Sequence, residues 1–248
     1  MAAAVAYSDS WNIKVCFTGA FYAPGHSESD TTINLKAALS FAATQDAQIG
    51  VYVAFRAAQL DDAVKIIRGE DIKPMMFDSQ TFGSVYENIA LGAPSNTGLR
   101  ETPVQHKTKP ILAHQNLPSH LDIQQAQANI ACIALYPGVD KQLLEAVSHK
   151  RKILIIDAYH SGTGPADAEE RELAEFIAAC SGKTKVLVGT LPRKFIDRPY
   201  DSTHELKKSG AHVYADLPHH VLYVYSILSL SISTKVKNII TALEPWEV

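Results

Sequence analysis

Apolar runs and amphipathic stretches alternate along much of the chain, which is typical of a protein built from strands and helices. Residues 153–158 are apolar except for Asp157 and lead into the turn sequence Ser-Gly-Thr-Gly-Pro at 161–165. This pattern predicts a buried parallel strand that ends in a tight loop, at a position that faces the ligand crevice of an open α/β sheet. A helix is expected next, beginning near Asp167 and burying Leu173, Phe176, Ile177 and Cys180.

The same periodicities predict elements on both sides of this strand. Further strands are expected at residues 13–17, 50–55, 130–136, 186–189 and 213–215, and a hairpin arm or edge strand at 59–67. Further helices are expected from Thr31 or Thr32, from Asp140 as a cap to 149, over 202–209 and over 218–230. Strands and helices that alternate regularly in the second half predict a parallel sheet with helices on both faces. Periodicity is lost between residues 92 and 124, which indicates a crossing between two domains.

Composition places the chain among soluble globular proteins. It has 248 residues, 46% of them hydrophobic, and a formal net charge of -3. The basic run at 149–152 closes a predicted helix, where cations suit the helix dipole, so nucleic acid is not an expected partner. The start of the chain lacks the pattern of a signal peptide, and no stretch approaches the length needed to span a bilayer. We therefore expect a cytoplasmic protein without membrane association.

Common nucleotide and nucleophile motifs are incomplete. Residues 181–184 (SGKT) resemble the end of a phosphate-binding loop, but Ile177 stands where that motif needs glycine. The loop at 161–165 does not fit the dinucleotide fingerprint, and no Gly-x-Ser-x-Gly elbow is present. The residue pattern alone thus predicts no nucleophile and no cofactor.

Histidines and cysteines do not form a ligand pattern. His219 and His220 are adjacent and should point apart on a helix, while His106, His114 and His120 lie in the stretch without periodicity. Scattered surface histidines are favoured over a metal site. The three cysteines, Cys16, Cys132 and Cys180, are widely spaced in apolar surroundings, which predicts buried free thiols in a reducing compartment.

Several segments, in order, resemble the threonine-dependent L-asparaginases and glutaminases. The stretch VCFTGAFYAPGHSESDTTINLKAALSFAA is similar to that family's strand, Gly-Ala turn, Ser-x-Asp loop and Asn-Leu helix, with Asp30, Asn34 and Leu35 at matching positions. Later similar segments are GVYVAFRAAQLDDAVKI, RETPVQHKTK, IALYPGVDKQLLEAV, ILIIDAYHSGTGP, LPRKFIDRPYD and SGAHVYADLPHHV. The resemblance implies an α/β fold of two parallel-sheet domains. The first, at residues 1–115, would be an N-terminally truncated flavodoxin-like domain, and the second, at 116–248, a small Rossmann-like domain.

The resemblance also implies hydrolysis of a side-chain amide. In the family, a threonine in a Thr-Gly-Gly-Thr motif attacks the amide, and a second threonine, in Gly-Thr-Asp-Thr, and a lysine activate it, because a hydroxyl is a weak nucleophile. This sequence contains neither motif, and Thr18 matches a different strand end. The lysine's place holds Ile67 when the segments are aligned without gaps, and small shifts bring Lys65 or Arg68 there. We therefore expect no catalytic residue in this chain.

Two residues are candidates for substrate binding by resemblance. In the family, a small polar residue after one strand of the second domain, and an acid after the next strand, reach a neighbouring subunit's site and contact the substrate's amino group. Thr163, or less securely Gly164, stands near the first position, and Asp201 stands at the second. An acid suits an ammonium group in a partly buried site. The alternatives are a turn-stabilising hydroxyl for Thr163 and a helix N-cap ahead of Ser202 for Asp201.

Three hypotheses remain at this point. The chain is one part of an asparaginase-like amidohydrolase acting on asparagine, glutamine or another small amide, a pseudoenzyme that binds or supports a partner, or a truncated product. The expected partners are further copies of the chain or a complementary N-terminal subunit that supplies the threonine motifs. An interrupted sheet should expose an unpaired edge and an apolar patch, which also predicts a partner.

Overall fold

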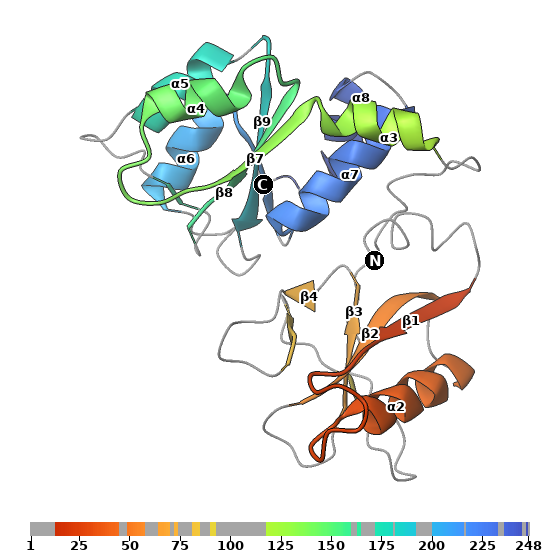
Figure 1. Ribbon diagram of the computed structural model, residues 1–248. Helices are drawn as coiled ribbons and strands as arrows, with labels where there is room; N and C mark the ends of the chain where they lie inside the picture. The colour runs from red at the N-terminus through yellow and green to blue at the C-terminus, as the bar shows by residue number, and fades with distance from the viewer. Residues whose placement is uncertain are drawn as a thin grey trace. The chain divides into compact units, whose positions relative to one another are not determined.

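The structure of the protein is a computed structural model. The structure describes residues 13–44, 49–57, 64–69, 72–73, 81–84, 90–92, 118–159, 163–164, 172–180, 182–191, 200–215, 217–232, 236–244 and 247. Contacts divide the chain into two compact units, Met1–His114 and Gln115–Val248. Each unit contains a sheet and at least one packed helix, so the predicted α/β class is confirmed (Figure 1).

The Met1–His114 unit is built on a mixed four-stranded sheet. The order is β1 (Lys14–Thr18), β2 (Gly50–Arg56), β3 (Val64–Arg68) and β6 (Ala90–Gly92). Strands β1 and β2 are parallel and joined through helix α2 (Thr31–Ala43), whereas β3 and β6 run antiparallel to their neighbours. The link from β2 to β3 is too short for a crossover helix, so β3 returns as the predicted hairpin arm. A separate two-stranded ribbon pairs β4 (Ile72–Lys73) with β5 (Gly83–Ser84).

Alternate residues of β2 serve two apolar clusters in this unit. Tyr52 and Ala54 pack under α2, while Val53 and Phe55 belong to the cluster that includes Ile67 and Ile72. Because both faces of β2 are covered, its sequence is apolar from Val51 to Phe55, as expected for a central strand.

The Gln115–Val248 unit is built on an all-parallel sheet. Its order is β10-β9-β8-β7, so successive strands are neighbours. The strands are β7 (Ile130–Ala134), β8 (Ile153–Asp157), β9 (Lys185–Leu191) and β10 (His212–Ala215). The helices are α3 (His120–Gln127), α4 (Lys141–Ser148), α5 (Glu172–Cys180), α6 (Asp201–Lys208), α7 (His219–Ile232) and α8 (Val236–Leu243).

Helices cover both faces of this parallel sheet, as predicted. Helices α4, α5 and α6 lie on one side, and α7 lies on the other with α3 packed against it (Figure 1). Strand β8 is fully enclosed: the side chains of its first four residues are inaccessible to solvent. Full enclosure explains why this strand reads as a continuous apolar run.

Local predictions can be compared with the elements of this unit. Asp140 caps α4 by accepting a hydrogen bond from the Leu143 N–H at 2.7 Å, as expected. Helix α5 buries Leu173, Phe176 and Ile177, whereas Cys180 is only partly buried, and the predicted start near Asp167 lies outside the described residues.

The predicted connection at residues 92–124 extends too far. Helix α3 begins at His120, and Ser119 and Asp122 form a capping box that fixes its start. Residues 93–117 lie outside the described part of the chain. In the described ranges, no helix combines the length and apolar character that crossing a membrane would need.

Candidate functional site

The carboxyl edge of the parallel sheet carries both residues that the sequence nominated. Thr163 follows β8, and Asp201 opens α6, which follows β9. Strands β8 and β9 are adjacent and parallel, with Asp157 beside Gly189 in the register. Parallel strands end at the same edge, so the topology brings both loops to one side of the sheet.

Thr163 lies in a turn that the main chain closes. Its carbonyl oxygen accepts a hydrogen bond from the Tyr159 N–H at 2.9 Å, and the residue is half-buried. Gly164 is tightly enclosed, because an added Cβ would lie 2.8 Å from Leu135 Cδ1 and 2.9 Å from Leu173 Cδ2. The core therefore encloses Gly164 at the sheet edge, and Thr163 is the residue before it.

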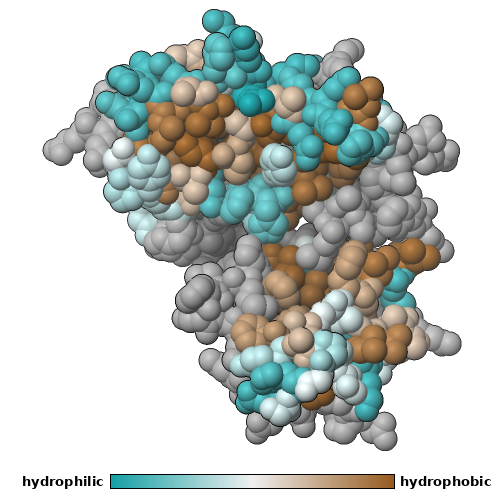
Figure 2. All heavy atoms as spheres, viewed as in Figure 1, coloured by the Kyte–Doolittle hydropathy of each residue, from teal (hydrophilic) through white to brown (hydrophobic). Residues whose placement is uncertain are grey.

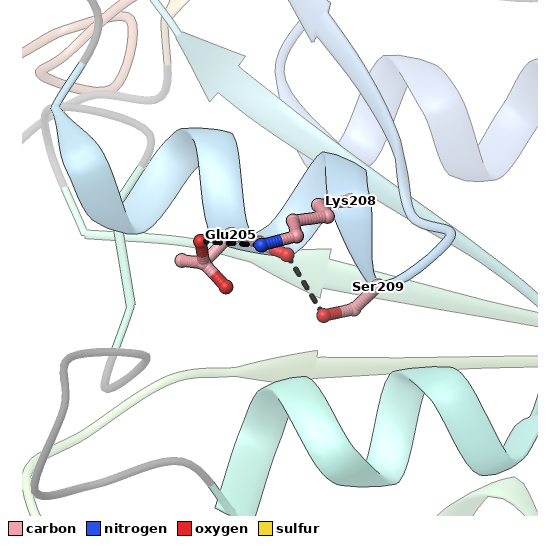
Figure 3. Close-up of polar contacts among 3 residues, drawn as sticks. All are labelled: Glu205, Lys208 and Ser209. Atoms are coloured by element: carbon pink, nitrogen blue, oxygen red, sulfur yellow. Dashed lines mark hydrogen bonds and ion pairs between the residues drawn. The ribbon is translucent and has the colours of Figure 1, made fainter.

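Asp201 is the first residue of α6 and is exposed. The N-cap is Tyr200, so the alternative interpretation of Asp201 as the N-cap is wrong. An acid in the first turn suits the helix dipole. The other end of α6 is held by a hydrogen bond from Ser209 Oγ to the Glu205 carbonyl at 2.8 Å and by an exposed Lys208–Glu205 ion pair at 3.6 Å (Figure 3). Asp201 thus lies exposed in the first turn of α6, at the end opposite these contacts.

A histidine–aspartate pair at the same edge was not predicted. His219 Nδ1 lies 2.9 Å from Asp157 Oδ1, joining the start of α7 to the end of β8. Both side chains are partly exposed. No sequence signal links residues 62 positions apart, because the contact depends on α7 returning across the sheet. An aspartate in this arrangement fixes the orientation of the imidazole ring and leaves Nε2 as its second polar atom.

Gly189 lets α7 approach the sheet at this point. An added Cβ would lie 2.5 Å from the Leu217 carbonyl oxygen, 2.9 Å from Leu222 Cδ1 and 3.3 Å from the His219 nitrogen. A side chain on β9 would therefore displace the segment that presents His219 to Asp157. The pair depends on glycine at a neighbouring strand position.

The histidine expectations require two corrections. The rings of His219 and His220 do not point apart but meet edge to face with centroids 5.5 Å apart. His212 also has a carboxylate partner, with Nδ1 2.7 Å from Glu247 Oε1. His120 opens α3, while His106 and His114 lie outside the described residues. The described residues contain no group of three or more histidine, cysteine or acidic side chains arranged to hold a metal ion.

Two positions of the first unit that match the family, Asp30 and Asn34, stabilise a loop through hydrogen bonds. Asp30 Oδ1 accepts a hydrogen bond from the Phe21 N–H at 2.8 Å, and Asp30 Oδ2 accepts one from Asn34 Nδ2 at 2.8 Å. Asn34 Nδ2 also donates to the Gly19 carbonyl at 2.9 Å. Asp30 is 3% exposed and Asn34 is inaccessible. This buried pair connects the loop after β1 to the start of α2, whereas Leu35 is exposed.

An apolar cavity of about 360 Å³ lies beside that loop. Aromatic side chains dominate its lining, with Phe55 and Phe82 in edge-to-face contact at 5.0 Å. The cavity-lining residues are Phe17, Thr18, Gly19, Ala20, Phe21, Val53, Phe55, Ile72 and Phe82. Such a lining suits an apolar group rather than a charged one.

Strand β3 contains the position that corresponds to the family's catalytic lysine, which Ile67 occupies when the segments are aligned without gaps. Ile67 is completely buried in the cluster with Val53 and Phe55, so this position serves the core. Lys65 is two residues away on the same strand and therefore shares the face of Ile67, whereas Arg68 points to the opposite face. Of the two shifted candidates, only Lys65 shares that face.

The three cysteines are free thiols, but they are not uniformly buried. Cys16 and Cys180 are partly buried, whereas Cys132 is exposed, so the prediction of burial is wrong for Cys132. Burial raises the pKa of Cys16 to about 11, partly offset by a hydrogen bond with the Ala54 backbone. Although Cys132 as a residue is exposed, partial desolvation of its thiol, and then the nearby charge of Asp157, raise its pKa.

Alkylation of Cys16 should be slow and should accelerate steeply with pH. A thiol with a pKa of about 11 instead of 9.0 has about 100-fold less thiolate near pH 8, and the thiolate is the reactive form. We expect iodoacetamide to label Cys16 at least about 100-fold more slowly in the folded chain than in urea, measured by mass spectrometry of the Cys16 peptide. Equal rates in the two states, or a rate that levels off near pH 9, would contradict this prediction.

Comparison with known proteins tests the resemblance to the asparaginase family. Residues 2–94 match the family model for the N-terminal domain of asparaginase. The resemblance to the asparaginase family is therefore confirmed. No curated protein sequence matches the chain.

Two solved L-asparaginases share the fold of this asparaginase-like chain. The thermostable L-asparaginase from Thermococcus kodakarensis is 20% identical, with a TM-score of 0.69, over 98% of this chain and 71% of its own. L-asparaginase I from Vibrio cholerae O1 biovar eltor str. N16961 is 18% identical, with a TM-score of 0.67, over 98% of this chain and 70% of its own. The likeness therefore extends to the Gln115–Val248 unit at the level of fold.

Proposed function

We propose that the chain is a component of an asparaginase-like amidohydrolase that acts on the side-chain amide of L-asparagine, L-glutamine or a similar small amino acid. The family match at residues 2–94 is the observation that carries this proposal. The common sheet edge of Thr163 and Asp201 supports it, because their family counterparts contact the substrate from loops after two successive strands.

The proposed role of the chain is to bind substrate for a neighbouring subunit's site. The Asp201 carboxylate would pair with the substrate ammonium group, and Thr163 would supply a small polar group from the adjacent loop. A charge-assisted contact of this kind fixes the substrate's orientation as well as its affinity. The hydroxyl that attacks the amide would come from a homologous or complementary subunit, because this sequence lacks both threonine motifs.

The purified chain alone should therefore release no ammonia from L-asparagine or L-glutamine. Amide hydrolysis needs an activated nucleophile and donors for the oxyanion, and neither family threonine motif is present. The measurement is ammonia release above a buffer blank, with a complete L-asparaginase as the positive control. Turnover by the chain alone would overturn the inactivity part of the proposal.

A complementation experiment tests the binding role. The chain is mixed with an N-terminal L-asparaginase fragment that carries both threonine motifs, and we expect ammonia release from the mixture only. Asp201→Asn should then lower kcat/KM by about 10- to 100-fold, because a charged hydrogen bond contributes about 1.5–3 kcal/mol. Glu205→Gln is the matched control, since Glu205 is an exposed acid on the same helix. Equal losses in the two variants would argue against a specific role for Asp201.

The second candidate function is a non-catalytic binding or partner subunit. The observation that favours it is Ile67, a fully buried apolar residue at the position where gapless alignment expects the lysine. Calorimetry with L-asparagine separates the two candidates. Binding without turnover in the complemented mixture supports the non-catalytic subunit, whereas turnover supports the enzyme component.

A further inference from the structure

Two loops that carry lysines lie side by side at the amino edge of the parallel sheet. The first connects α4 to β8, and the second connects α5 to β9. They are joined by a hydrogen bond from Thr184 Oγ to the Arg151 carbonyl at 2.7 Å and by one from the Lys185 N–H to the Lys152 carbonyl at 2.9 Å. The lysines of these loops and of the strand start beside them, here named the amino-edge lysines, are Lys150, Lys152, Lys183 and Lys185.

Main-chain groups, rather than the amino-edge lysines, complete the ends of the neighbouring helices. Cations often gather at helix ends because the last carbonyl groups lack partners. At the end of α4 the Ser148 carbonyl accepts a hydrogen bond from the Arg151 N–H at 2.9 Å. At the end of α5 the Cys180 carbonyl accepts one from the Gly182 N–H at 2.8 Å. Within the described part of the chain, none of the four lysine side chains is in an ion pair or a hydrogen bond. Their charges repel one another, and a bound anion would relieve that repulsion.

A small polar pocket of about 180 Å³ lies beside Lys152, between α3, the start of β8 and the end of α7. Its uncharged polar residues are Gln125, Asn129 and Ser231. The acid in its lining, Asp122, is held by Ser119, whose N–H and hydroxyl donate to Asp122 Oδ2 at 3.1 Å and 2.6 Å. Pockets for drug-sized ligands usually measure about 300–1,000 Å³, so this pocket suits a smaller polar molecule.

We propose that the amino edge binds a small phosphate monoester. Its phosphate lies at Lys152 and is attracted by the other amino-edge lysines, while its uncharged polar part occupies the pocket. Phosphate fits better than a carboxylate, because it carries about two negative charges and several acceptor oxygens that separate ammonium groups can share. A planar carboxylate pairs best with the fork of an arginine, and the Arg151 guanidinium is already hydrogen-bonded to the Ala128 carbonyl.

The proposed site lies at the opposite end of the strands from Thr163 and Asp201. Those two residues follow β8 and β9, whereas the amino-edge lysines precede these strands or begin them. Hydrophilic residues predominate at the top of this unit in the space-filling view, where β9 begins in Figure 1 (Figure 2). Phosphate binding at this edge therefore does not depend on the proposed amide hydrolysis.

Calorimetry with glycerol phosphate tests the site in the full chain. We expect it to bind more tightly than inorganic phosphate, because only the ester also contacts the pocket, and to bind more weakly as sodium chloride is added. Lys152→Gln should weaken binding by at least about 10-fold, since a hydrogen bond to a charged group is lost. Lys141→Gln is the matched control and should bind as the wild type does, because Lys141 begins α4 at the other edge of the sheet.

A second variant, Lys150→Gly, separates the charge of the site from the stability of the fold. Lys150 has a φ of 57° in the turn after α4, a conformation that glycine adopts without strain. We expect thermal stability to be kept or raised, while glycerol phosphate binds about 2- to 5-fold more weakly. The proposal is overturned if the wild type does not bind glycerol phosphate, if the ester and inorganic phosphate bind equally, or if Lys141→Gln and Lys152→Gln weaken binding to the same extent.

Discussion

Replacing Gly189 with alanine is expected to lower the free energy of unfolding of the Gln115–Val248 unit by about 3 kcal/mol. The new Cβ would lie 2.5 Å from the Leu217 carbonyl oxygen, a main-chain atom that cannot rotate away. Helix α7 would have to shift, and its shift would separate His219 from Asp157. The loss should appear as an earlier urea transition, with faster hydrogen exchange in peptides from β9 and α7.

Alanine substitutions at Gly164 and Gly182 are the controls for the prediction at Gly189. At Gly164 the described atoms that the added Cβ would meet are side-chain methyl groups of Leu135 and Leu173, so alanine should cost less, about 1–2 kcal/mol. At Gly182 no atom of the described residues lies within 4 Å of the added Cβ, and alanine should change stability by less than about 0.5 kcal/mol. Equal effects at Gly182 and Gly189 would show that the close approach of α7 does not limit the stability of this unit.

Asp30→Ala is expected to destabilise the Met1–His114 unit by about 3 kcal/mol, because it leaves buried polar groups without partners. The carboxylate receives hydrogen bonds from the Phe21 N–H and from Asn34, and both Asp30 and Asn34 are buried. Without it, the loop after β1 loses its hydrogen bond through the Phe21 N–H and keeps the one from Asn34 Nδ2 to the Gly19 carbonyl. Hydrogen exchange of peptides covering Thr31–Ala43 measures this local loss directly.

The control for this prediction lies in the same loop. Glu28 is exposed, so Glu28→Ala removes an acid of similar chemistry without breaking a buried contact. We expect a change of less than about 0.5 kcal/mol and unchanged exchange of the α2 amides. Comparable losses in the two variants would mean that general charge, rather than the buried pair, stabilises the loop.

The strand order of the second unit does not form the ligand crevice that the sequence analysis expects beside β8. Its strands follow one another in sequence order, and the order does not reverse among the described strands. A reversal creates the crevice in which open α/β sheets commonly bind ligands. Thr163 and Asp201 therefore lie on an edge that this sheet alone does not enclose, which accords with a proposed role in completing a neighbour's site.

Elements with strong periodicity were predictable because one structural cause dominates each pattern. Strand β8 and the buried stripe of α5 follow from apolar spacing, and the start of α4 follows from Asp140. Errors occurred where the signal is weak. Helix α3 has a polar sequence, so apolar periodicity predicts no helix at His120–Gln127, and only the capping box of Ser119 and Asp122 signals its start. Most predicted strand ends lie within two residues of those in the structure, whereas the strand expected from residue 59 begins at Val64.

The residues of the candidate site show the same difference between what local sequence predicts and what tertiary contacts decide. Thr163 and Asp201 were nominated through resemblance, and their common edge follows once the strands are parallel. The Asp157–His219 pair had no signal, because its partners are distant in sequence and meet only through the return of α7. The resemblance matches Asp30 and Asn34 to the family, but it does not predict their burial or their hydrogen bonds to the loop after β1.

The sequence by itself determined the α/β class, the order of most elements and the lack of both threonine motifs, because these depend on local patterns and residue identity. Tertiary structure alone decided which distant residues meet. It paired His219 with Asp157, required glycine at position 189 and joined Asp30 to the Phe21 N–H and to Asn34. Such features arise from the packing of segments far apart in the chain, which local periodicity does not encode.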